Sequence, residues 1–203
     1  MSASCGSNCE FDGQDPKFKR ALWIVIAINI VMFLVEMVAG QMAGSKALQA
    51  DALDFFADGV TYGISLAVIG ASLRIRSIAA MAKGISLLVM GLWVMGSTLY
   101  SVLSPGMPEA PVMGAIAFLA LLANLSSVLI LRKWNQGDAN VRSVWLCSRN
   151  DAISNVAVML AAVGVFGTGT AWPDLLVAVI MAGLFLSSAF QIIRQAKSEH
   201  NRG

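Results

Sequence analysis

The stretch LQADALDFFADG, residues 48–59, places three aspartates inside an apolar run that extends from residue 47 to residue 73. At about 100° per residue, Asp51, Asp54 and Asp58 lie within roughly 60° of one another, so one face of a helix carries all three carboxylates. Such groups are costly at membrane depth and face a protein interior or a water-filled path. A polar seam between packed helices is the alternative interpretation, but a seam needs one polar residue rather than three aligned acids.

The composition is that of a membrane protein. Of the 203 residues, 57% are hydrophobic and 13% are charged, and the mean hydropathy is +0.72. A net charge of +2 with scattered basic residues argues against nucleic acid as a partner. Residues 1–19 are polar and acidic, so no cleavable signal peptide is expected. The three cysteines are too few for a disulfide framework, and Cys147 lies in an apolar segment.

The apolar runs predict six helical spans, separated by turn-forming residues. The spans cover residues 21–43, 47–73, 77–103, 110–131, 141–166 and 173–193. We therefore expect an all-α membrane protein with six transmembrane helices, with lipid as its surroundings.

The basic residues predict the orientation. All but Lys46 and Arg149 fall on one side of the predicted spans, and the positive-inside rule makes that side cytoplasmic. These residues are Lys17, Lys19, Arg20, Arg74, Arg76, Lys83, Arg132, Lys133, Arg142, Arg194, Lys197 and Arg202. Both termini are then cytoplasmic. We expect a flexible cytoplasmic tail over residues 1–19, a six-span domain over 20–195 and a short cytoplasmic tail over 196–203.

A second polar group lies in the fifth predicted span. Cys147 and Asp151 stand four residues apart on one helical face, and Asn155 continues that face. Together with Asp54 and Asp58 they offer four oxygen and sulfur ligands from two helices, which suits a tetrahedral divalent cation such as zinc. Cys147 by itself would be interpreted as a small buried hydrophobe.

These features resemble the cation diffusion facilitator family. The resemblance covers residues 20–195 and rests on features in the first, second, fifth and sixth spans. They are Asn29, Glu36, Gly40, Ser45, Leu48, the run Ala50-Asp51-Ala52, Asp54, Asp58, Asp151, Ser154 and the pair Pro173-Asp174. Members of that family are proton-coupled metal exporters with six spans. Their tetrahedral site takes two residues from span two and two from span five, and the matching positions here are Asp54, Asp58, Cys147 and Asp151.

The resemblance implies a secondary transporter that exports a divalent metal from the cytoplasm in exchange for protons. It implies a multi-pass protein of the bacterial inner membrane, with no enzymatic activity and no bound cofactor. Two departures matter. The position of Cys147 is usually His or Asp, and a thiolate favours zinc or cadmium over manganese or magnesium. We expect this protein to lack the cytoplasmic domain that usually follows span six, so we expect a homodimer held by the transmembrane helices.

Several polar residues keep two interpretations. Asn29 and Glu36 share a face of the first span and are either groups that support the metal ligands or helix-packing residues. Asp51 is either a proton-relay group or a partner of Arg149. Asp174 favours the N-terminus of the sixth helix. Cys5 and Cys9 either hand a metal to the pore or belong to a flexible tail.

Two other classes of membrane protein are alternative interpretations of this sequence. Metal-dependent membrane transferases, such as phosphotransferases and prenyltransferases, also use aspartate-rich helices. However, Asp51 and Asp54 are followed by Phe55 instead of the Gly and Ala-Arg of one pattern, and Asn150-Asp151 has no later aspartate before Asp174. The remaining alternative is a regulatory membrane protein that transports nothing.

Overall fold

The protein is a bundle of long helices in the computed structural model, as the six apolar runs predict. The structure describes residues 15–67, 73–103, 106–134 and 139–200, without the side chains of residues 65, 73–77, 134, 139–150, 195 and 198–200. Its helices are α1 (Pro16–Met42), α2 (Lys46–Ala67), α3 (Leu73–Leu103), α4 (Ala110–Leu131), α5 (Ala139–Thr168) and α6 (Trp172–His200), with a short 3-10 turn η1 (Arg132–Trp134) after α4. The described residues contain no strand.

Some helices begin several residues before the predicted spans, because they include polar residues that flank the apolar runs. Helix α1 begins at Pro16, where the Asp15 side chain accepts a hydrogen bond of 2.8 Å from the backbone N–H of Lys17. Proline suits the first helical position because its missing N–H would have no intrahelical partner there. Helix α3 begins at Leu73, so Arg74 and Arg76 lie in its first turn.

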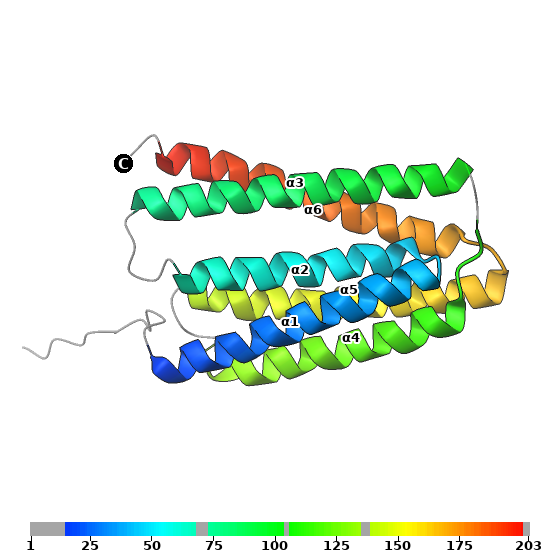
Figure 1. Ribbon diagram of the computed structural model, residues 1–203, viewed down its shortest axis with the longest axis horizontal. Coiled ribbons are helices and arrows are strands. Elements are labelled where there is room, and N and C mark those ends of the chain that lie inside the picture. Colours follow the sequence, from blue (N-terminus) through cyan, green and yellow to red (C-terminus); the bar gives the residue numbers. More distant parts are fainter. Residues whose placement is uncertain (1–14, 68–72, 104–105, 135–138, 201–203) are drawn as a thin grey trace, which may run out of the picture.

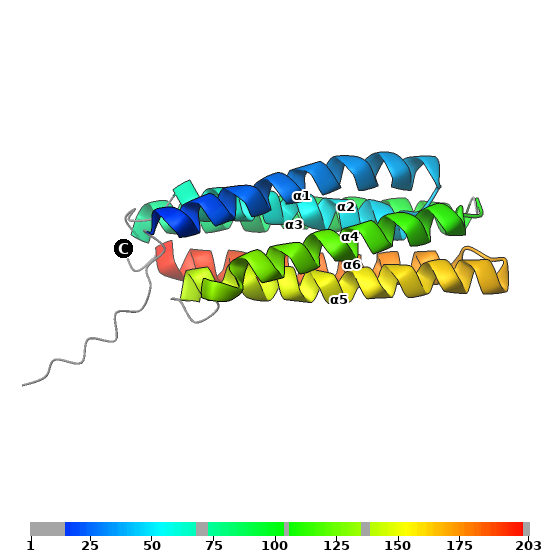
Figure 2. The same cartoon turned by 90° about the horizontal axis from the view of Figure 1, so that it is seen from below.

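The helices associate as three pairs, α1 with α2, α3 with α6, and α4 with α5. Figure 1 shows α3 and α6 together along one side, α1 and α4 along the other, and α2 and α5 between them. The turned view in Figure 2 places α1 and α5 on opposite faces of the bundle. Helix α2 contacts α1, α3, α5 and α6, so it is the most enclosed element.

Within the described residues, five helices are long and apolar enough to cross a membrane, and the described part of α2 is not one of them. Asp51, Asp54 and Asp58 lower the mean hydropathy of that described part. The neighbouring helices shield α2, whereas large apolar side chains such as Trp23, Val31 and Phe166 remain exposed on the outside of the bundle. An apolar exterior around an acidic interior is the arrangement that a bilayer requires.

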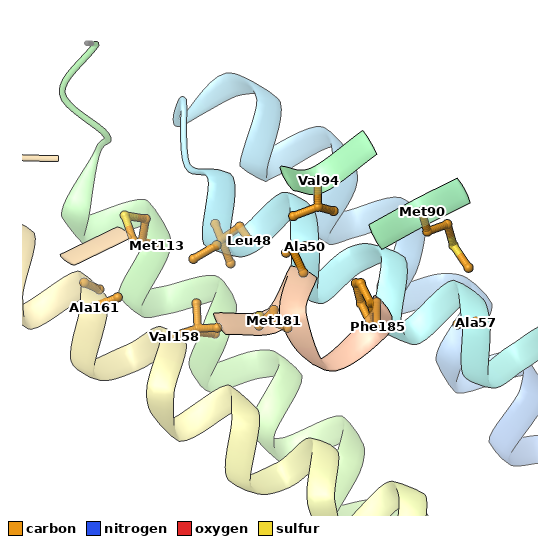
Figure 3. Close-up of a cluster of buried hydrophobic side chains, with 14 of the residues drawn as sticks. Leu48, Ala50, Ala57, Met90, Val94, Met113, Val158, Ala161, Met181 and Phe185 are labelled. Atoms are coloured by element: carbon orange, nitrogen blue, oxygen red, sulfur yellow. The ribbon is translucent and has the colours of Figure 1, made fainter. Parts of the chain in front are cut away.

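The largest buried cluster joins five helices around α2 and α6. Figure 3 shows Leu48 of α2, Val94 of α3, Met113 of α4, Val158 of α5 and Phe185 of α6 converging in this cluster. A second cluster, which we call the α1–α4 plug, lies in the half of the bundle nearer the start of α1. It consists of Phe18, Leu22, Val25, Ile26, Tyr62 and Leu131.

Two glycines form the tight connections at the other end of the bundle. Gly44 ends α1 with φ of 67°, and Gly169 ends α5 with φ of 63°, in the left-handed region that glycine adopts without a Cβ clash. The Ala43 carbonyl between α1 and α2 accepts a hydrogen bond of 2.9 Å from the Glu109 N–H before α4. This bond ties two connections together at the end of the bundle where α2 begins.

Candidate functional site

The acidic face of α2 points into the bundle, as its spacing predicts. Asp51 is fully buried at 1% exposure, while Asp54 and Asp58 are partly exposed. The three aspartates interact with different helices. Asp51 interacts with Glu36 of α1, whereas Asp54 and Asp58 interact with Asp151 of α5. Helix α2 therefore carries two acidic groups with different surroundings.

Asp151 of α5 lies opposite Asp54 and Asp58 of α2. Its carboxyl comes within hydrogen-bonding reach of Asp54 and of Asp58, so three of the residues predicted as ligands lie near one another on helices α2 and α5. The hydroxyl of Ser154 donates to the Asp151 backbone carbonyl at 2.9 Å and lies at the same level of α5. Carboxyl groups this close repel one another when ionised, and a bound cation or a shared proton would offset that repulsion.

A cavity opens beside these carboxylates. It has a volume of about 230 Å³, and its lining includes Asp54 of α2 together with Asp151 and Ser154 of α5. Helix α6 supplies the other lining residues, which are Met181, Leu184, Phe185 and Ser188. The role of α6 as a wall of the site was not predicted from the sequence. Its apolar residues are typical of any buried helix face, and Ser188 has no acidic neighbour to mark it.

Asp58 has two further partners. The Tyr62 hydroxyl, one turn along α2, donates a hydrogen bond to Asp58 Oδ2. The charge of Lys83 on α3 lies close enough to interact with Asp58. Tyr62 was missed as a site residue, although its place four residues after Asp58 extends the acidic face by one turn and is visible in the sequence.

Asp51 pairs across the helix boundary with Glu36 of α1. Glu36 is fully buried at 0% exposure, and the two carboxyls lie within hydrogen-bonding reach of each other when one of them carries a proton. Elsewhere among the described residues, neither Glu36 oxygen nor Asp51 Oδ2 has a hydrogen-bond partner. One shared proton would therefore satisfy both groups. The alternative partner of Asp51, Arg149, has its side chain outside the described part.

Cys147 lies one turn before Asp151 in α5, but its side chain also lies outside the description. Within the described part of the chain, no three His, Cys, Asp or Glu side chains converge closely enough to hold a metal ion. The four-ligand set thus stays a prediction, as do the assignments of Cys5 and Cys9, which lie outside the described residues.

The two asparagines near the acids have different surroundings. The Asn29 side chain donates to the Val25 carbonyl of its own helix at 2.8 Å and lies against Gly59 of α2. Asn155, one turn after Asp151, is fully buried, and neither polar atom of its amide has a partner among the described residues. Buried amides usually have partners, so the Asn155 amide is an exception within the described part of the chain.

Asp174 has a role that the sequence did not predict. It lies in the first turn of its own helix, α6, as expected, and its carboxylate also caps α2. Asp174 accepts hydrogen bonds from the Ser45 hydroxyl at 2.6 Å, from the Lys46 N–H at 2.8 Å and from the Ala47 N–H at 3.0 Å. Ser45 in turn accepts from the Leu48 N–H at 3.0 Å. Together the two side chains satisfy three of the backbone N–H groups that the first turn of α2 leaves free.

This cap matters because it holds α6 against the N-terminal end of the helix that carries the aspartates. Asp174 is fully buried, at 0% exposure. The residues that line the cavity begin seven positions later on α6, about 10 Å along the helix at 1.5 Å per residue. The cap therefore fixes the position from which α6 reaches the acidic site.

The chain is similar to known proteins over nearly the whole helical bundle. Residues 22–199 match the family model of the cation efflux transmembrane domain. A zinc transporter, ZitB of Yersinia pestis, is 29% identical over 92% of this chain and 64% of its own length. The metal cation efflux system protein CzcD of Cupriavidus metallidurans is 27% identical over 80% of this chain and 55% of its own length.

A cadmium, cobalt and zinc/H(+)-K(+) antiporter of Bacillus subtilis is 23% identical over 88% of this chain and 62% of its own length. The chain thus spans less than two thirds of the length of these relatives. The match to the family model extends from α1 to the last turn of α6 and includes every helix that forms the acidic site. The protein is a multi-pass membrane protein, and it belongs to the cation efflux family.

Proposed function

We propose that the chain exports a divalent transition metal, zinc or cadmium, from the cytoplasm through a site formed by Asp54, Asp58, Cys147 and Asp151. The observation that carries the proposal is the approach of Asp151 on α5 to both Asp54 and Asp58 on α2, in the interior of the bundle and beside a cavity. The names of the relatives support the choice of metals, because they are a zinc transporter and an antiporter of cadmium, cobalt and zinc.

The proposed transport is an exchange of metal for protons. Carboxylates and a thiol must lose their protons to bind a metal, and they regain them when the metal leaves. The Glu36–Asp51 pair, which one proton would satisfy, provides a second place for a proton next to the site. The metal enters from the cytoplasmic side, where both termini lie in this proposal. The ion leaves on the opposite side after α6 and its partner α3 move against α2 and α5, and the inward protons drive the cycle.

In this proposal the metal ion is transported without being chemically converted. We therefore propose a transporter with no enzymatic activity and no resident cofactor, in line with the transporter names of its relatives. A homodimer formed through the transmembrane helices remains part of the proposal. It is open to a direct test by the mass of the purified protein in detergent.

The proposal is tested by zinc flux into proteoliposomes. Asp54→Ala, Asp58→Ala and Asp151→Ala each remove one ligand, so each is expected to lower the flux by at least about tenfold. Glu109→Ala is the matched control, because Glu109 is an exposed acid before α4 whose side chain makes no capping hydrogen bond. Normal flux in any two of the three aspartate variants would show that the assignment of the site is wrong.

A further inference from the structure

Tyr62 holds one oxygen of a proposed metal ligand. Its hydroxyl donates to Asp58 Oδ2, and the residue is fully buried, at 0% exposure. The ring belongs to the α1–α4 plug and packs among Phe18, Leu22 and Leu131. Because the ring is enclosed on the side away from Asp58, the hydroxyl is a donor with a fixed position rather than one that swings to and from solvent.

The fixed donor limits how Asp58 can bind a metal. A carboxylate binds an ion through one oxygen or through both, and the larger hard cations make frequent use of both. Because the Tyr62 hydroxyl occupies one lone pair of Oδ2, Oδ1 is the oxygen of Asp58 that binds a metal with less competition. One oxygen from each carboxylate suits a four-coordinate zinc ion at about 2.0–2.2 Å. Manganese prefers six oxygen ligands and loses more when a carboxylate is restricted to one oxygen.

We propose that Tyr62 is a specificity-determining residue, which holds Asp58 as a single-oxygen ligand and thereby favours zinc over manganese. The inference rests on the proposed function, because it assumes that Asp58 binds the transported ion. It goes beyond that function by assigning a role to a residue outside the four ligands. Partners that orient a metal ligand change metal affinity by about 10–100-fold when they are removed, and the effect here is expected in the ratio of two metals.

The alternative is that Tyr62 is a core residue whose hydroxyl merely needs an acceptor. Both roles predict some loss of stability when the hydroxyl is removed, because Asp58 loses a hydrogen bond. They differ in selectivity. A packing role leaves the ratio of zinc to manganese affinity unchanged, whereas a specificity role lowers it, and the ratio does not depend on how much protein folds.

The experiment compares Tyr62→Phe with the wild-type full chain in detergent, with zinc and manganese affinities measured by calorimetry. The variant keeps the ring in the α1–α4 plug and removes only the hydroxyl. Tyr100→Phe is the matched control, since Tyr100 is the second of the two tyrosines and is 71% exposed on α3. We expect the zinc-to-manganese affinity ratio to fall by about tenfold or more in Tyr62→Phe and to stay constant in Tyr100→Phe. An unchanged ratio in Tyr62→Phe overturns the inference.

Two further measurements separate the causes of failure. If Asp54→Ala still binds zinc as the wild type does, the proposed site is wrong; if it does not, and the Tyr62→Phe ratio is unchanged, only the role of Tyr62 is wrong. X-ray absorption at the zinc edge of the wild-type protein needs no variant, so it tests the premise of single-oxygen binding even if Tyr62→Phe does not fold. A four-coordinate shell is expected, and a shell of five or six ligands would contradict single-oxygen binding by Asp58.

Discussion

Removing the Asp174 carboxylate should weaken the attachment of α6 to α2. Asp174→Ala deletes the acceptor of three hydrogen bonds and leaves the Lys46 and Ala47 N–H groups without a partner at a buried helix start. Losing a helix cap costs about 1 kcal/mol, and each buried donor left unpaired costs about 1–3 kcal/mol. Because Ser45 still caps the Leu48 N–H, the expected total is at the lower end, about 2–4 kcal/mol.

The assay is thermal unfolding of the purified protein in detergent, followed by tryptophan fluorescence. For a chain of this size, the expected loss corresponds to a fall in Tm of roughly 5–10 °C. Asp174→Asn keeps one acceptor oxygen and should fall between Asp174→Ala and the wild type. Glu109→Ala, at the same end of the bundle, should leave the Tm unchanged. A Tm of Asp174→Ala equal to that of the wild type would refute the reasoning.

Three more predictions concern packing, selectivity and pH. A Cβ added at Gly84 would lie 2.6 Å from Ile193 Cγ1 of α6. Gly84→Leu should therefore destabilise the α3–α6 pair by about 1–3 kcal/mol in the same melting assay. A Cβ at Gly96 would have no neighbouring atom within 4 Å, so Gly96→Leu should leave the Tm unchanged. Cys147→His should keep zinc flux and weaken cadmium relative to zinc, because imidazole is a harder donor than thiolate; equal relative fluxes would place Cys147 outside the ligand set. Zinc affinity measured by calorimetry should fall about tenfold per pH unit for each proton displaced as the buffer becomes acidic, and a constant affinity would argue against proton competition.

The fold was predictable because a bilayer leaves few options for apolar runs of this length. Hydropathy predicted all six helices, and the structure confirms them. The helix ends were less predictable, since they depend on local capping. Asp15 and Pro16 start α1 before its apolar run begins, and no hydropathy average detects such a cap.

The site was predictable where it follows the period of one helix. The spacing of Asp54 and Asp58 placed both on the inner face, and Asp151 lies opposite them as the pairing of spans two and five implied. Tyr62 could have been added by the same rule. Contacts between helices were beyond such reasoning. The Asp174–Ser45 bond joins residues 129 positions apart, and the Glu36–Asp51 pair depends on how α1 rotates against α2.

The central claim is that metal moves through the acidic site in exchange for protons, and one measurement tests it most directly. Proteoliposomes that contain a pH-sensitive dye receive a zinc gradient at zero membrane potential, while zinc movement and lumenal pH are recorded together. We predict a pH change opposite in direction to the zinc flux, and we predict that both signals disappear in Asp58→Asn. Zinc movement without any pH change, or with an equal flux through Asp58→Asn, would contradict the account.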